Sequence, residues 1–376
     1  MISFQAIPFQ FLRPGYALIA FCAMALSGST AWGLTFNITA PPSISAQALA
    51  GFQAAGDQWE ALFFDDITVN IDVNFTTLGA GILGSTSTSQ GSIAYNGFSA
   101  SLAGDIQSAD DTAAVASLPI GSSFPLYINR TADNPNGAGN ATPYIDNDGG
   151  GNNSTIRMSF ANAKAVGLLP AHDPAIDATI AFSSSFTWDF DPTNGITPGA
   201  FDFVGAATHE IGHALGFLSG VDILVANAPP NNGPFNDDLF TYVYPMDMFR
   251  FSAGSVGAQL GLRDWTADTR VKYFSLDGGT TSVTGNSQFA TGLTFGDGRQ
   301  ASHWKDNLGL GILDPTAAAG ELMVITPLDI RLFDVIGYNL TADQVEAVPE
   351  PATLGLMAAG LLGLMLAAVR RSGLTR

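Results

Sequence analysis

The chain has 376 residues, of which 46% are hydrophobic and 12% charged, and its 33 acidic and 14 basic side chains give a net charge of −19. This apolar content is ample for a large core, and the sparse charge with many Gly, Ser, Thr and Asn residues favours an exported, loop-rich protein over a disordered chain. The acidic surface repels nucleic acid, which argues against a DNA or RNA partner, and it can attract divalent cations.

Residues 1–33 are predicted to be a secretory signal peptide. Arg13 supplies the positive charge, residues 16–26 form a short apolar stretch, and small residues up to Gly33 complete a cleavage-site pattern. A buried N-terminal helix is the alternative. The one cysteine, Cys22, lies inside this segment. The mature chain is therefore predicted to contain no disulfide, no cysteine metal ligand and no cysteine nucleophile.

Hydrophobic periodicity predicts the elements that follow in chain order. They are a helix at 45–63 with Ser45 as a candidate N-cap, a strand at 67–75, a short helix near 108–117, a strand at 178–190, a helix from about 201 to 220, short elements around 237–251 and 269–275, and a helix at 327–338. Strands and a helix followed by an isolated helix and irregular structure indicate the α+β class. Residues 34–200 and 201–345 are expected to be two parts of one catalytic domain.

The sharpest chemical signal is the His-Glu-x-x-His motif of His209, Glu210 and His213. Residues four apart lie on the same side of a helix, so both imidazoles can reach one metal ion. The glutamate between them projects beside the metal, where it can take a proton from a water molecule. The chain has only four histidines, and a buried helix carrying two unpaired histidines and a glutamate would be costly. The motif therefore predicts a zinc site.

Catalytic zinc needs a third protein ligand, which can be sought by elimination. His303 is the one histidine after His213, and it is the preferred candidate. Asp222 lies close in sequence and is a minor candidate, since oxygen also binds zinc. Glu321 is the first glutamate after the motif, so a downstream-glutamate site would have to use it.

The segment His209 to Phe217 resembles the active-site helix of leishmanolysin-type metzincins. In that family a long insertion separates this helix from a third histidine that is commonly followed by tryptophan, and Ser302-His303-Trp304 is similar. The resemblance covers about 201–220 and 300–338. It implies a zincin or metzincin-like fold, with a mixed sheet and an active-site helix, and a zinc endopeptidase with His209, His213 and His303 as ligands and Glu210 as general base.

Two departures from the metzincin pattern are visible. The short metzincin motif places its third histidine ten residues after the first, where this chain has Ser219. The family also has a methionine in the turn beneath the zinc, and the aligned position here is Leu313, with Met323 further along. That methionine is a packing residue, and an exchange with leucine is usually tolerated.

The segment Asp146 to Gly151 resembles a calcium turn. The position at which an EF-hand needs its glutamate holds Arg157. A flexible acidic surface loop fits the same segment equally well. Calcium is accordingly kept as a second candidate cofactor beside zinc.

The C-terminal residues 346–376 resemble a PEP-CTERM sorting signal of Gram-negative bacteria. Pro349-Glu350-Pro351 is followed by an apolar run from Ala352 to Val369 and then by Arg370 and Arg371. The run has about the minimum length of a membrane span, and the arginines favour a cytoplasmic end. The resemblance implies processing by an exosortase-type enzyme, transient inner-membrane association and a final location at the cell surface or outside. A permanent single-span anchor is the alternative.

The sequence thus predicts an exported zinc endopeptidase that hydrolyses peptides or proteins by means of a zinc-activated water, with Glu210 as general base. A non-catalytic surface or matrix-binding protein on the same fold is the main alternative. The intact Glu210 argues against that alternative. A zinc hydrolase acting on a non-peptide bond is a further one.

Overall fold

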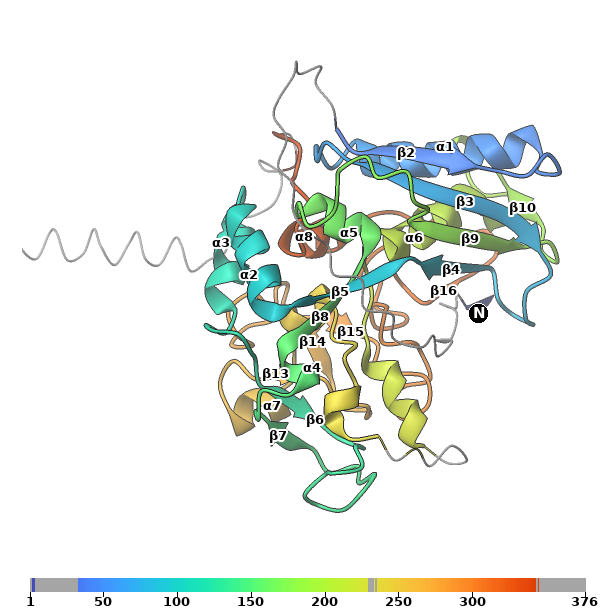
Figure 1. Ribbon diagram of the computed structural model, residues 1–376. Coiled ribbons are helices and arrows are strands. Elements are labelled where there is room, and N and C mark those ends of the chain that lie inside the picture. The colour runs from blue at the N-terminus through green and yellow to red at the C-terminus, as the bar shows by residue number, and fades with distance from the viewer. Residues whose placement is uncertain (1, 4–32, 229–232, 234, 343, 345–376) are drawn as a thin grey trace, which may run out of the picture.

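A mixed four-stranded sheet forms one half of the protein (Figure 1). The computed structural model describes residues 2–3, 33–228, 233, 235–342 and 344. The sheet has the order β2-β3-β9-β4 and consists of β2 (Thr35–Thr39), β3 (Thr68–Thr76), β9 (Ala178–Ser183) and β4 (Gly84–Thr88). The first three strands are parallel, whereas β4 runs antiparallel to β9 at one edge.

Helices α1 (Ala46–Glu60) and α6 (Phe203–Leu215) pack side by side against this sheet. The Phe52 ring of α1 lies 5.4 Å from that of Phe182 in β9 and 5.0 Å from that of Phe203 in α6. The two helices approach closely because position 51 is glycine, where a Cβ would stand 2.6 Å from the Phe203 ring. An aromatic core thereby fixes both helices to the sheet.

The other half of the molecule consists of short elements joined by long connections (Figure 1). The strands pair as β5 (Gln90–Ala94) with β8 (Thr155–Ser159); β13 (Arg263–Asp264), β6 (Leu126–Ile128) and β7 (Tyr144–Asp146); β12 (Arg250–Phe251), β14 (Lys272–Phe274) and β15 (Gln288–Phe289); β10 (Trp188–Asp189) with β11 (Phe201–Asp202); and β1 (Ile2–Ser3) with β16 (Thr316–Ala317). Because β13 pairs with β6, segments on both sides of residue 200 share one sheet.

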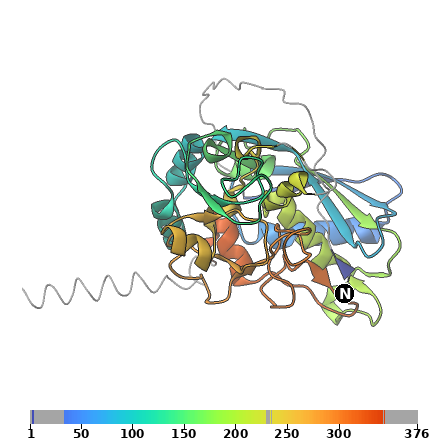
Figure 2. The same ribbon diagram turned by 90° about the horizontal axis from the view of Figure 1, so that it is seen from below.

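Six further α-helices and four 3-10 turns connect these strands within the described residues. They are α2 (Tyr95–Gly104), α3 (Ala109–Ser117), α4 (Gly151–Ser154), α5 (Phe160–Ala165), α7 (Ala253–Ala258), α8 (Pro327–Val335), η1 (Pro192–Asn194), η2 (Val221–Asn227), η3 (Asp237–Leu239) and η4 (Pro245–Phe249). In Figure 2, α8 in orange-red lies beside α6 in yellow-green, and the Phe333 ring of α8 is 4.8 Å from that of Trp59 in α1. Helix α1 therefore contacts both α6 and α8.

The α+β class is confirmed, and most of the predicted elements are present. Ser45 caps α1, accepting a hydrogen bond from Ala48 N at 3.1 Å, and β3 matches the alternating strand predicted at 67–75. The strand predicted at 178–190 is wrong in length. It stops at Ser183, and Trp188–Asp189 pairs with a different strand, β11, in a separate small sheet.

The signal peptide and the sorting tail fall almost entirely outside the described residues. This holds for residues 4–32 of the expected signal peptide and for the apolar run of 352–369. Among the residues that the structure does describe, none of the helices combines the length and apolar character that crossing a bilayer requires.

Candidate metal centre

Helix α6 positions the two histidines of the His-Glu-x-x-His motif. Its N-cap Asp202 accepts a hydrogen bond from Gly205 N at 2.9 Å. The helix ends where Gly216 adopts a φ of 117°, in the left-handed region that favours glycine. The Tyr338 hydroxyl donates to the Leu215 carbonyl at 2.7 Å, which satisfies one of the last helical acceptors. The helix is thus held at both ends, and all its residues are buried.

Three imidazoles meet between α6 and the loop that carries His303. Nε2 of His213 lies 3.1 Å from Nε2 of His209 and 3.2 Å from Nε2 of His303. In the described part of the chain, this is one of two groups whose potential ligand atoms all lie within 4.8 Å of one another. Each of the three side chains is at most 1% exposed. The structure therefore brings together the three histidines selected from the sequence.

Each imidazole contacts a backbone carbonyl with its other ring nitrogen. Nδ1 of His209 lies 2.7 Å from the Ile312 carbonyl oxygen, and Nδ1 of His213 lies 2.9 Å from that of Phe217. Nδ1 of His303 lies 3.2 Å from the Gln300 carbonyl oxygen. A carbonyl only accepts, so each Nδ1 carries the proton and each Nε2 presents a lone pair to the centre.

This arrangement fits a zinc ion. Burial lowers the pKa of all three imidazoles, that of His213 to about 4, so they are neutral and able to act as ligands. Three lone pairs that face one another repel unless a cation lies between them. Tetrahedral zinc with Zn–N bonds of 2.0–2.1 Å places its nitrogen ligands about 3.3 Å apart, close to the spacing of these Nε2 atoms. The Nδ1–carbonyl contacts are of the kind that orients histidine ligands in metal sites.

Glu210 points from α6 toward the edge strand β4. The Thr86 hydroxyl donates to Glu210 Oε2 at 2.5 Å, while Oε1 has no hydrogen-bond partner among the described residues. A Cβ at Gly84 would stand 2.5 Å from Oε1, so the glycine leaves room for the carboxylate. Burial raises the pKa of Glu210 to about 8, with partial relief from Thr86. Glu210 is not a member of the three-histidine group of ligand atoms.

The loop with His303 is tied to the chain that leaves α6. The Asp222 carboxylate accepts hydrogen bonds from Ala301 N at 2.7 Å and from Leu293 N at 2.8 Å. Ser302 Oγ accepts from Ser219 N at 2.9 Å. Asp222, the minor ligand candidate, therefore fastens the loop next to His303 and is not in the group of ligand atoms.

Glu321, the remaining ligand candidate, is not in the three-histidine group, and the two candidate Met-turn residues lie at different places along α6. Glu321 is exposed, and its Oε2 accepts a hydrogen bond from Ala318 N at 2.7 Å. Leu313 is buried beneath α6, where a Cβ at Gly212 would stand 3.1 Å from its side chain. Met323 instead lies at the start of the helix, where a Cβ at Gly205 would stand 2.6 Å from it. Leu313, not Met323, thus packs against the histidine-bearing turn.

Sequence reasoning missed two contributors to this site. Thr86 lies in a Gly-, Ser- and Thr-rich segment with no apolar pattern, and nothing in the sequence links it to Glu210. The Ile312 carbonyl is a backbone group, which carries no residue signature. Trp304, by contrast, was one of the residues that carried the family resemblance. Its backbone N donates a hydrogen bond to the Leu313 carbonyl at 3.0 Å. That contact places residues 303 and 312 on adjoining segments.

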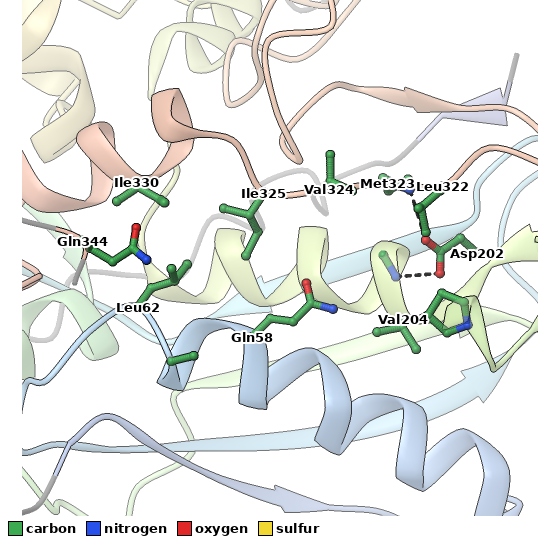
Figure 3. A pocket seen from close by; sticks show the side chains of 13 residues that line it. Gln58, Leu62, Asp202, Val204, Leu322, Met323, Val324, Ile325, Ile330 and Gln344 are labelled. Carbon is green, nitrogen blue, oxygen red and sulfur yellow. Dashed lines mark hydrogen bonds between the residues drawn. The ribbon is translucent and has the colours of Figure 1, made fainter. Parts of the chain in front are cut away.

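A separate cavity of about 480 Å³ lies at the N-terminal half of α6, between α1 and the loop around Met323 (Figure 3). Its lining is largely aliphatic, and Asp202 stands at one end, where it also accepts a hydrogen bond from Met323 N at 3.1 Å. Neither Glu210 nor any of the three histidines lines it. The cavity is therefore distinct from the metal centre.

The C-terminal end of the chain matches a known protein family. Residues 347–371 match the family model of the PEP-CTERM protein-sorting motif. No curated protein and no solved structure shows a significant match to the chain. The chain thus carries a PEP-CTERM sorting signal, which implies an exported, membrane-processed protein that is recognised by an exosortase-type enzyme.

Proposed function

We propose that this protein is a zinc-dependent endopeptidase of the zincin type, similar to leishmanolysin-like metzincins, that acts outside the cytoplasm of a Gram-negative bacterium. One observation carries the proposal. Three buried imidazoles direct their Nε2 atoms at a common point, while a carboxylate from the same helix lies outside that group of atoms. Three neutral nitrogen ligands with a neighbouring carboxylate base are the equipment of hydrolytic zinc sites.

The roles of the residues follow from their chemistry. His209, His213 and His303 would hold the ion, leaving one position for water, and bound zinc lowers the pKa of that water to near neutrality and polarises a carbonyl group. Glu210 accepts the proton of the water as it attacks the peptide carbonyl, and then passes the proton to the departing amine. The Thr86 hydroxyl holds the Glu210 carboxylate in place through Oε2 and leaves Oε1 for the water.

The position of an edge strand beside Glu210 favours a polypeptide as the class of substrate. β4 is an edge strand, and none of the other described strands pairs with its outer side. Thr86 belongs to β4 and contacts Glu210, so the edge runs beside the general base. An extended peptide that adds to this edge would bring its carbonyl groups past the metal centre. β9 cannot take this role, because it lies between β3 and β4.

Zinc binding alone does not separate an enzyme from a non-catalytic protein on the same fold. The three histidines and Glu210 are all at most 1% exposed, and a purely structural zinc site would be equally buried. The decisive measurement is hydrolysis. The full chain, purified with its metal, is expected to contain one zinc per molecule and to cleave a fluorescent unfolded protein.

Removal of the metal provides the matched test. Treatment with a zinc chelator is expected to abolish cleavage, and added Zn²⁺ is expected to restore it. Stoichiometric zinc without any hydrolysis would favour the matrix-binding alternative. Cleavage of ester or phosphoester substrates, with peptides left intact, would assign the site to another class of hydrolase.

Truncation before Val348 is expected to leave folding and peptidase activity intact and to change where the protein accumulates. Within the described part of the chain, the contacts with the core lie before this cut, since Phe63 and Leu340 form a β-bridge and Thr341 N donates to the Leu62 carbonyl at 2.9 Å. Thermal unfolding and cell fractionation test this. A cut before Tyr338 is the control and should destabilise the protein, because it removes the hydroxyl that caps α6. A truncated chain that fails to fold would give the tail a structural role.

A further inference from the structure

A second group of potential metal ligands lies where two loops distant in sequence meet. Carboxylate oxygens of Asp148, Asp237 and Asp238 all lie within 4.8 Å of one another. The contact is made by the turn before α4 and by η3. Gly151 N donates to Asp238 Oδ1 at 2.7 Å, and a Cβ at Gly150 would overlap the Asp238 carboxylate. The glycines of the Asp-Gly-Gly-Gly turn thereby allow the two acidic loops to touch.

Two more carboxylates, those of Asp133 and Asp146, adjoin this group, and its negative charge has no basic partner in the described part of the chain. Asp237 N donates to Asp133 Oδ1 at 3.2 Å. The pKa of Asp237 is raised to about 7, mainly by burial and also by Asp133 and Asp146, while the Tyr144 hydroxyl opposes the rise. Within the described ranges, none of these five carboxylates forms an ion pair with lysine, arginine or histidine.

The buried amides beside the group supply an independent observation. Asn152 and Asn153 are fully buried, and the Oδ1 atom of each lacks a hydrogen-bond partner among the described residues. Nδ2 of Asn152 donates to Asp146 Oδ2 at 2.7 Å. Both amide atoms sit on one carbon, so the unpartnered Oδ1 of Asn152 lies beside the same carboxylate. A buried carbonyl oxygen next to carboxylates is unfavourable unless a cation or donor satisfies it.

We propose that Asp148, Asp237 and Asp238, with Asp146 and the Asn152 carbonyl beside them, form a calcium site that fastens the two loops together. The donors are all oxygen, as calcium requires, and calcium accepts the six to eight ligands of irregular geometry that flexible loops and water can provide. The site is not an EF-hand, because Arg157 lies in β8 and donates to Gln90 Oε1 at 2.6 Å. Such a site would bind calcium whether or not the three-histidine centre hydrolyses peptides.

Calorimetric titration of the full chain with CaCl₂ tests the site directly. The protein is purified in detergent with zinc bound, and its buffer is freed of calcium with a chelating resin. We expect one saturable site with a Kd on the order of 10⁻⁴ to 10⁻³ M, as in extracellular calcium modules. Saturating calcium should raise the Tm by about 2–4 °C or more, because only the folded chain holds the site.

A double variant, Asp148→Asn with Asp238→Asn, is expected to weaken calcium binding at least about tenfold and to leave zinc content unchanged. Both side chains are exposed, and asparagine can still accept the turn hydrogen bonds, so the fold should persist. Asp57→Asn, which removes the same charge from an exposed position on α1, is the control and should bind calcium normally. Absence of saturable binding to the unmodified chain, equal binding by the double variant, or equally tight binding of Mg²⁺ would each overturn the assignment.

Discussion

Replacing Glu210 by Gln is expected to leave zinc bound and to lower kcat/KM for peptide hydrolysis at least about a hundredfold, the low end of what a general base contributes. Glutamine keeps the shape of the side chain and can still accept the Thr86 hydrogen bond, but it cannot take a proton from water. The carboxylate is not part of the three-histidine group, so zinc content should not change. Metal analysis and steady-state kinetics measure the two quantities separately.

Glu321→Gln is the matched control for this experiment. It makes the same chemical change at an exposed glutamate and preserves an acceptor for Ala318 N. Both zinc content and hydrolysis are expected to stay at the level of the unmodified protein. If the Glu210 variant loses zinc, Glu210 is a ligand or a structural residue. If it cleaves peptides at the original rate, the hydrolytic mechanism has to be abandoned.

The parts of the fold that were predictable are those with a local signal. α1 and β3 show their period in one stretch of sequence, and the Ser45 side chain marks the start of α1. The helix predicted from about 201 to 220 instead ends at Leu215, because Gly216 adopts a left-handed conformation. The approach of the two motif histidines to each other was predictable from their spacing of four residues along a helix. His303 was reachable by elimination because the chain has so few histidines.

The parts that escaped prediction depend on contacts between distant segments. β4 is polar and short, so its place at the sheet edge beside Glu210 follows only from its pairing with β9. The acidic turn at 146–151 was recognisable, but its meeting with Asp237 and Asp238 was not, because those residues are far away in the sequence. Backbone acceptors such as the Ile312 carbonyl leave no trace in the sequence at all.

Replacing His303 by Ala is expected to weaken zinc binding about as much as replacing His209, by more than the 10–100-fold that outer hydrogen-bonding partners contribute. Both imidazoles present Nε2 to the same centre, both are fully buried, and each has its Nδ1 on a backbone carbonyl. Loss of either would leave two protein ligands where catalytic zinc has three. Competition with a chromogenic zinc chelator measures both affinities on one scale.

Asp222→Ala separates a ligand from a residue that merely supports one. Because the Asp222 carboxylate accepts hydrogen bonds from Ala301 N and Leu293 N, its loss should loosen the loop that carries His303. The expected weakening of zinc binding is therefore within about 10–100-fold, smaller than that of His303→Ala. The reverse order, with zinc retained after His303→Ala and lost after Asp222→Ala, would show that the third ligand is Asp222. A third ligand of that kind would replace a neutral nitrogen by a carboxylate and so lower the net positive charge that the metal presents to its water.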